Sequence, residues 1–199
     1  MSSDFYEILK TRRSNYTIGK TETVPIDTIE ETIITAMTHA PSAFNHQPAR
    51  VVALFREHHQ KLWDIVWEVL KETAPPENLA QTKEKLDDFA AGYGTLLFLI
   101  DEDAVRQMQE RFPLYADNFP TWAEQSTGML QYVLWAALDA QGLGVNLQHY
   151  NPLIDSRVHA QWDIPQNHRL ISQMVLGSRE APPEEKELID PWQRVRLFK

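Results

Sequence analysis

Arg12, Arg13 and Ser14 form the first of three polar clusters whose side chains could do chemistry. Two arginines can grip a phosphate with paired hydrogen bonds, and a serine hydroxyl can add a third. Because adjacent side chains project in different directions, both arginines can serve one elongated anion only if the chain turns there. The alternative is a solvated helix end, where arginine is favourable beside the C-terminal dipole. Taken alone, the base rate for surface charge favours that alternative.

The second cluster spans residues 39–48 and contains Pro41, Ser42, Asn45 and Gln47. The amides of Asn45 and Gln47 carry both donors and acceptors, as the edge of a heterocycle such as a flavin pyrimidine requires. The alternative is an ordinary turn between a helix and a strand, since Asn, Ser and Pro are common turn residues. Composition alone weighs the two interpretations equally.

The third cluster follows a long apolar segment and opens with a pair of glycines. Its members are Gly142-Leu143-Gly144 and the polar run Gln148-His149-Tyr150-Asn151. Such a run is unusually polar for a place beside the core. The alternatives to a functional role are that His149 is a core histidine whose hydrogen bonds are made within the protein, and that the glycine pair simply ends a helix. A metal-binding role for His149 is not expected, since no second ligand stands at a useful spacing.

Composition and missing motifs exclude several classes of function. The sequence contains no Cys, which removes disulfides, thiol nucleophiles and Cys-based metal sites. It also lacks a Walker phosphate loop, Gly-x-Gly-x-x-Gly, Gly-x-Ser-x-Gly and His-Glu-x-x-His. A net charge of −9 argues against a nucleic-acid partner, although a phosphate-bearing cofactor needs only a few local cations. Because neither a signal peptide nor a membrane-spanning stretch is recognised, we expect a cytoplasmic protein without membrane partner or metal.

Apolar periodicity predicts the elements that must position these clusters. Helices are expected at residues 4–13, 25–39, 61–73, 78–91 and 118–141, with a further short helix opened by Asp101 and Asp103. Strands are expected at residues 51–55, 94–100, 145–147, 170–176 and, as an edge strand, 195–198. Helices followed by interleaved strands and helices indicate a three-layer α/β or α+β arrangement, without fixing the strand order. No repeat or linker divides the chain, which favours one domain over residues 1–199.

The longest expected helix has an unusual second half. Residues 129–140 are apolar on nearly every side, so this segment belongs in the centre of a core or in a dimer interface.

The histidine pair His58 and His59 lies at an expected loop-to-helix junction. Both side chains are expected to be solvated rather than to bind a metal.

In this order, the three clusters resemble the nitroreductase family of flavoproteins. That family carries an Arg-Arg-Ser-type motif after its first helix, Pro-Ser-x-x-Asn-x-Gln-Pro after its second, and Gly-Leu-Gly after its long central helix. Here these are residues 12–14, 41–48 and 142–144, so the resemblance covers nearly the whole chain.

Finer features place the resemblance within the family. Residues 89–95, 115–120 and 148–152 resemble the compact branch, which includes the fungal fatty acid repression mutant proteins and the bacterial copper-induced nitroreductases. The sequence departs from the wider family at Tyr16, where many members have Lys or Arg. It also departs at Ala49, where many members have an aromatic residue.

The resemblance implies an α+β fold of the three-layer α-β-α type. A central, mostly antiparallel sheet would be flanked by helices. The family forms homodimers with two FMN molecules at the interface, and the long buried helix would lie there. The C-terminal segment, about residues 190–199, would reach onto the partner subunit.

By the same resemblance, Arg12 would bind the phosphate or ribityl end of FMN, with Arg13 and Ser14 beside it or on the pyrimidine. Asn45 and Gln47 would touch the flavin ring edge, across the dimer. The run of residues 148–151 would pass the ring near its reactive nitrogen. The residues assigned to cofactor binding are Arg12, Arg13, Ser14, Pro41, Ser42, Asn45, Gln47, Gln148, His149, Tyr150, Asn151 and, as candidates to complete the phosphate site, Arg179 and Lys186.

The implied function is an FMN-dependent oxidoreductase that reduces nitroaromatic or quinone-like acceptors with NADH or NADPH in ping-pong fashion. FMN carries the chemistry, so no catalytic side chain is assigned. A donor to the reduced pyrimidine edge, with Arg13 or Gln47 as candidates, would stabilise the developing anion. One alternative is a flavin-binding sensor or carrier with little turnover, and another is a plain interaction module. The sequence leaves open the physiological acceptor, the preferred donor, and a role in detoxification, metal stress or regulation.

Overall fold

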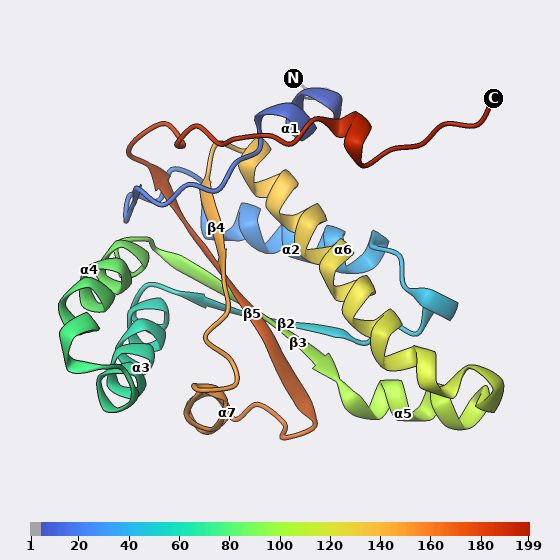
Figure 1. Cartoon of the computed structure of the whole chain (residues 1–199). Coiled ribbons are helices and arrows are strands. Elements are labelled where there is room, and N and C mark those ends of the chain that lie inside the picture. The colour runs from blue at the N-terminus through green and yellow to red at the C-terminus, as the bar shows by residue number, and fades with distance from the viewer. Residues whose placement is uncertain (1–4) are drawn as a thin grey trace.

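The computed structural model describes residues 5–199, and Figure 1 shows an antiparallel sheet crossed by a long diagonal helix. The helices are α1 (Phe5–Thr11), α2 (Ile26–His39), α3 (Glu57–Thr73), α4 (Leu79–Ala90), α5 (Glu102–Arg111), α6 (Phe119–Ala140) and α7 (Asp155–Trp162). The strands are β1 (Ile18–Gly19), β2 (Ala49–Phe55), β3 (Gly94–Asp101), β4 (Gly144–Gln148) and β5 (His168–Arg179).

The long strand β5 organises the sheet. It pairs with β3 along one edge and with β4 and β1 along the other, and β3 pairs in turn with β2. All of these pairings are antiparallel, with Gly144 opposite Gly177 and Ala49 opposite Ile100. The sheet is open, and the α+β class expected from the sequence is confirmed.

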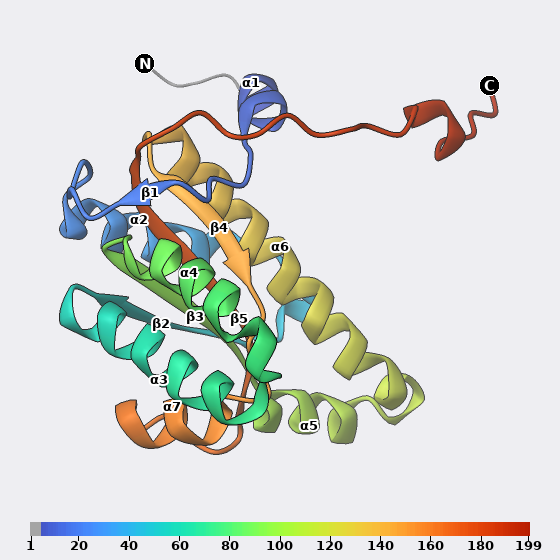
Figure 2. The ribbon, with the colours of Figure 1, turned by 60° about the vertical axis from the view of Figure 1, so that its left-hand side comes forward.

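Helices cover both faces of the sheet, because β3 is apolar on both of its faces. Leu97 and Leu99 pack with α3, α4 and α7, whereas Leu96 and Phe98 pack with α2 and α6. A strand that is buried on both faces carries a continuous apolar run instead of alternating with polar residues. Figure 2 shows α3, α4 and α7 on one side of the sheet and α6 on the other, which confirms the three-layer arrangement.

Helix α6 buries one side and leaves another apolar side open. Leu130, Leu134 and Leu138 are buried towards the sheet. Met129 and Tyr132 on the opposite side are 42% and 37% exposed. Within residues 5–199, no helix is both long and apolar enough to cross a membrane.

Three expectations about elements require correction or addition. Residues 195–198 are not an edge strand; they are exposed and have no ladder partner in the described chain, so their alternation does not reflect a sheet. The first helix ends at Thr11, because the Asn15 backbone N–H must reach Val145 O at 2.9 Å. Its expected first residue, Asp4, lies outside the described residues. Strand β1 and helix α7 were not expected, since each is short.

His59 is buried, contrary to the expectation that both histidines are solvated. Its side chain is 1% exposed, and its Nδ1 lies 2.8 Å from Thr95 Oγ1 on β3. Burial lowers the pKa of His59 to about 4. His58, its neighbour, is exposed as expected.

Candidate functional site

The segment after α1 and the segment after β5 meet at a cleft, here called the Arg12 cleft. It encloses about 210 Å³ and is lined by Arg12, Arg13, Ser14, Tyr16, Glu184, Glu185 and Lys186. Figure 1 shows the segment after β5 running past α1, which brings residues 12–14 beside residues 184–186. The sequence-predicted residues Arg12, Arg13, Ser14 and Lys186 are therefore brought together.

Arg12 is held at the cleft by aromatic rings. Its guanidinium carbon lies 4.5 Å from the ring centre of Trp135 and 5.9 Å from that of Tyr132, both on α6. Cation–π contacts orient a guanidinium without consuming its N–H donors. The buried Nε of Arg12 has no hydrogen-bond partner among residues 5–199. An acceptor brought by a ligand would satisfy this donor.

Arg13 ties the C-terminal segment to the cleft. Its Nη2 donates to the backbone oxygen of Glu184. The carboxylates of Glu184 and Glu185 offset part of the positive charge, while Lys186 adds an ammonium to the same lining. Two guanidinium groups, a hydroxyl and an ammonium form a donor set that fits the phosphate end of a nucleotide cofactor.

Arg179, the other candidate after β5, does not line the Arg12 cleft. Its Nε donates to Leu143 O at 2.9 Å, and its Nη2 contacts both O and Oδ1 of Asp139 at 2.8 Å. Burial raises the pKa of Asp139 above its ordinary value, although the charges of Arg179 and Arg12 act in the opposite direction. Arg179 thus fastens the end of α6 to β5.

A chain of amides fixes the turn that follows Arg13. Asn146 Nδ2 donates to Asn15 O at 2.8 Å, and Gln148 Nε2 donates to Asn146 Oδ1 at 2.9 Å. Ile18, which follows this turn, packs so closely on β4 that a Cβ on Gly144 would lie 2.7 Å from Ile18 Cγ2, and it would also reach Asn15 Cβ at 3.4 Å. The second glycine of the Gly-Leu-Gly motif is therefore needed for close packing against the Arg12 cleft's N-terminal segment.

The third cluster turns two of its side chains inward. Gln148 is buried on Asn146, and Tyr150 packs on Trp63, with ring centres 5.8 Å apart. Burial raises the pKa of Tyr150 to about 12. His149 is exposed, so a ligand could reach its side chain directly, and Asn151 is half-buried.

Gln173 on β5 fixes this run from the sheet, and sequence reasoning missed it. Its Oε1 accepts from the Tyr150 backbone N–H at 2.8 Å, and its Nε2 donates to Asn151 Oδ1 at 3.4 Å. The polar pair Ser172-Gln173 within the apolar run of residues 170–176 was the signal available in the sequence.

The loop of residues 41–48 has a conformation that is unusual for its residues. Phe44, Asn45 and Gln47 have φ angles of 53°, 54° and 48°, in the left-handed region that residues with a Cβ seldom adopt. Such conformations cluster at functional sites. The loop borders a cavity of about 100 Å³, which is lined by Met37, Ala40, Pro41, Ser42, Gln47, Pro48, Ala49, Arg50, Ser126 and Leu130.

The cavity beside the loop and the Arg12 cleft are separate, and they border different stretches of α6. Ser126 and Leu130 reach the loop, whereas Trp135 and Asp139 reach the cleft and its surroundings. Sequence reasoning did not find Trp135, because nothing in an apolar helix marks which aromatic will face a cation.

Comparison with known proteins gives a consistent result along the chain. The model of the nitroreductase family matches residues 9–178. Nitroreductase FRM2 of Saccharomyces cerevisiae is 32% identical over 191 residues, covering 95% of both chains. Nitroreductase CinD from Lactococcus lactis, solved in complex with chloramphenicol, superimposes with a TM-score of 0.90 at 42% identity, covering 98% of this chain and 100% of that one.

A more distant likeness shows the fold alone. A protein from Desulfovibrio desulfuricans, solved in complex with FMN, superimposes with a TM-score of 0.71 at 15% identity. The match covers 100% of this chain and 98% of the other.

Proposed function

We propose that this chain, which belongs to the nitroreductase family and is an oxidoreductase, binds FMN and uses NADH or NADPH to reduce nitroaromatic or quinone-like acceptors. The observation that carries the proposal is the Arg12 cleft. It gathers phosphate-binding donors, and one of its lining residues, Arg12, has a buried Nε that lacks a partner in the described chain.

The chain's own residues would hold the cofactor by its two ends. Arg12, Ser14 and Lys186 of one subunit would bind the phosphate end, while Asn45 and Gln47, on the loop of residues 41–48 of the other subunit, would meet the ring edge. When bound, FMN supplies the redox chemistry by accepting hydride from the nicotinamide and passing electrons to the acceptor, in ping-pong order. The protein contributes position and hydrogen bonds, without an acid or base of its own.

Nitroaromatic acceptors have the more direct support. CinD, at about two-fifths sequence identity, is solved with chloramphenicol and with 4-nitrophenol, which are both nitroaromatic compounds. Quinones are proposed because they are flat two-electron acceptors of similar size.

We propose a homodimer for reasons of exposed apolar surface. Met129, Tyr132 and Val133 leave an apolar side of α6 open. The segment after Arg179 runs beyond the body of the subunit (Figure 2). Large apolar side chains on this segment are exposed: Leu188, Ile189, Trp192, Val195, Leu197 and Phe198. A second subunit would cover both surfaces, and the Asn45–Gln47 loop of one subunit could then meet the flavin held by the other.

The test compares FMN with riboflavin, which lacks the phosphate. Hydrogen bonds to a charged group contribute about 1.5–3 kcal/mol. FMN should therefore bind at least about tenfold more tightly than riboflavin when flavin fluorescence is titrated with the protein. Equal affinities would contradict the role of the Arg12 cleft, and the absence of binding by either flavin would contradict the proposed function.

A further inference from the structure

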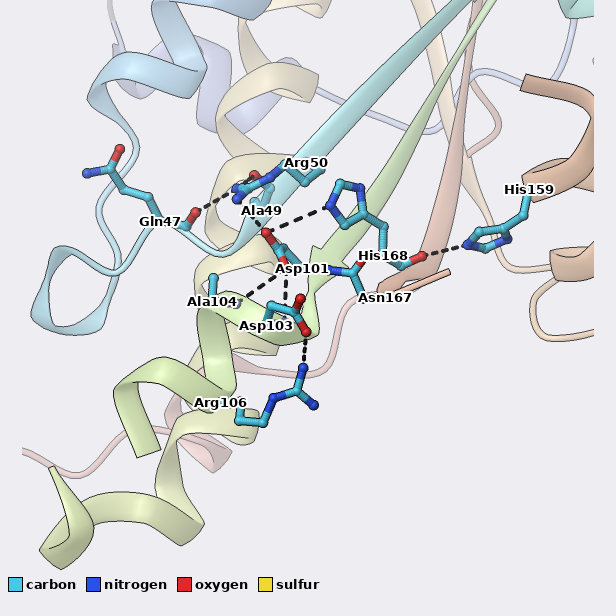
Figure 3. Close-up of polar contacts among 10 residues, drawn as sticks. All are labelled: Gln47, Ala49, Arg50, Asp101, Asp103, Ala104, Arg106, His159, Asn167 and His168. Carbon is cyan, nitrogen blue, oxygen red and sulfur yellow. Dashed lines mark hydrogen bonds and ion pairs between the residues drawn. The ribbon is translucent and has the colours of Figure 1, made fainter. Parts of the chain in front are cut away.

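The loop of residues 41–48, here called the strained loop, is linked to the rest of the protein by Arg50, at the start of β2. Arg50 Nη1 donates to Gln47 O at 2.9 Å and to Ala49 O at 3.0 Å. Its Nη2 donates to Asp101 Oδ2 at 2.7 Å (Figure 3). Because a guanidinium is a planar fork with fixed donor directions, these bonds fix the position of the Gln47 carbonyl relative to the end of β3.

Asp101 is a well-fixed anchor for this fork. Its Oδ1 accepts from the backbone N–H groups of Asp103 and Ala104 at 3.0 and 3.3 Å, and from Asn167 Nδ2 at 3.1 Å (Figure 3). Its own backbone N–H donates to Pro48 O at 2.9 Å. Asp101 therefore holds the end of the loop directly and through Arg50.

The charges around Asp101 favour its ionised form. Burial raises the pKa of the Asp101 carboxyl, but the N–H groups of Ala104 and Asp103 and the charges of Arg50 and His168 outweigh burial, so its pKa lies below the ordinary value. The Asp101 side chain is 14% exposed and that of Arg50 is 38% exposed. An ionised, largely covered carboxylate is a fixed acceptor for one arm of the fork.

The loop's functional side chains depend on this backbone support. Asn45 and Gln47 are exposed. Gln47 Nε2 makes a long contact of 3.4 Å to Asn45 O, and Gln47 N donates to Ser42 Oγ at 3.0 Å. The left-handed backbone, more than any side-chain bond, therefore determines the position from which the Gln47 side chain projects.

We infer that Arg50 is a positioning residue: by holding the Gln47 carbonyl, it keeps residues 45–47 in the conformation that presents the Asn45 and Gln47 amides to the flavin edge. This inference rests on the proposed function, because it requires the loop to meet a flavin. A merely structural Arg50–Asp101 pair would stabilise the sheet without affecting the flavin.

The test uses the full chain with and without FMN, and compares Arg50→Ala with Arg56→Ala. Arg56 is a matched control because it also makes a 2.7 Å ion pair, with Glu22, but follows the opposite end of β2. Hydrogen–deuterium exchange reports on the loop amides, fluorescence titration on FMN affinity, and spectroelectrochemistry on the midpoint potential of bound flavin.

Arg50→Ala should speed exchange of amides 45–47 roughly tenfold without FMN, the factor expected for one lost hydrogen bond. It should raise the Kd for FMN by a similar factor and lower the midpoint potential, while exchange in β3 and β5 stays unchanged. Arg50→Lys, which keeps the charge but loses the fork, should be intermediate. Arg56→Ala should change none of these quantities.

Unchanged exchange at residues 45–47 in Arg50→Ala would overturn the inference. So would faster exchange with FMN affinity and midpoint potential both at wild-type values, because Arg50 would then be purely structural. If Arg50→Ala also speeds amide exchange in β3 and β5, Asp101→Asn is the second variant to test. It removes the carboxylate that Arg50 contacts, while asparagine can still cap α5. Protected amides 45–47 and wild-type FMN affinity in that variant would overturn the inference. A wild-type protein that binds no FMN would instead overturn the proposed function, and the inference with it.

Discussion

Replacing Arg12 with alanine should weaken FMN binding far more than it changes the stability of the protein without FMN. The Arg12 Nε is buried and has no partner in the described chain, while the guanidinium rests on Trp135 and Tyr132. The cation–π contacts are present with and without the phosphate, so they cancel from the binding free energy. The change in affinity therefore reports the hydrogen bonds that Arg12 makes to the phosphate.

Two magnitudes separate binding from stability. A hydrogen bond to a charged group contributes about 1.5–3 kcal/mol, so Arg12→Ala should raise the Kd for FMN by about 10- to 150-fold. In the protein without FMN, removing a buried unpaired donor relieves about 1–3 kcal/mol, and losing the cation–π contact costs about 0.5–2 kcal/mol. These terms oppose each other and the midpoints of the two ranges nearly cancel, so the free energy of unfolding should change by roughly 1 kcal/mol.

The assay is fluorescence titration of FMN into the stripped protein, paired with urea unfolding of the same samples. Arg157→Ala is the control, since it removes one positive charge from an exposed ion pair with Glu72 on another part of the surface. Arg12→Lys should fall between alanine and wild type, because lysine keeps the charge but offers no planar fork. An Arg12→Ala variant with wild-type FMN affinity would refute the assignment of Arg12 to the phosphate.

Two further predictions concern the fold that carries the site. Folding lowers the pKa of His59 from 6.5 to about 4, so between these pH values the unfolded chain binds a proton at His59 and the folded chain does not. The free energy of unfolding should therefore fall by up to about 3 kcal/mol as the pH falls from 6.5 to 4. His59→Phe should make urea unfolding less pH-dependent over this range, and an unchanged dependence would show that His59 is not the source. Gly177→Ala should destabilise the protein by about 1–3 kcal/mol, because its Cβ would lie 2.6 Å from Gly19 O. A wild-type melting temperature for Gly177→Ala would contradict that close strand packing.

The layers of the fold were predictable from local patterns. The apolar run at residues 94–100 and the helical stripe that includes Leu62 and Val66 give β3 and α3 with small shifts of their ends. The apolar residues 129–140 correctly predicted the long helix α6. These features depend on side-chain periodicity within one segment, which a sequence displays directly.

Features that depend on pairing were not predictable. Residues 195–198 alternate like a strand, but alternation says nothing about whether a partner strand lies alongside. The burial of His59 follows from its contact with Thr95, which only the packing of α3 on β3 brings near.

The site itself was predictable in part. Arg12, Arg13 and Ser14 are contiguous, so the sequence placed them near one another, and the turn that follows α1 brings all three to the lining of one cleft. Arg179 and Lys186 looked equivalent as cations after β5, and the structure separates them because Asp139 already engages Arg179.

The role of Arg50 lay beyond sequence reasoning for the same reason. It is 51 positions from Asp101, and they meet because Ala49 lies opposite Ile100 in the β2–β3 register.

An absorption spectrum of the FMN-loaded protein under anaerobic conditions tests FMN-dependent reduction by a nicotinamide donor. We expect flavin bands that bleach when NADH or NADPH is added and return when a nitroaromatic acceptor such as chloramphenicol follows. Flavin that stays oxidised with both donors would contradict the enzymatic role and favour a flavin sensor or carrier. A protein that takes up no FMN at all would contradict the assignment of the Arg12 cleft.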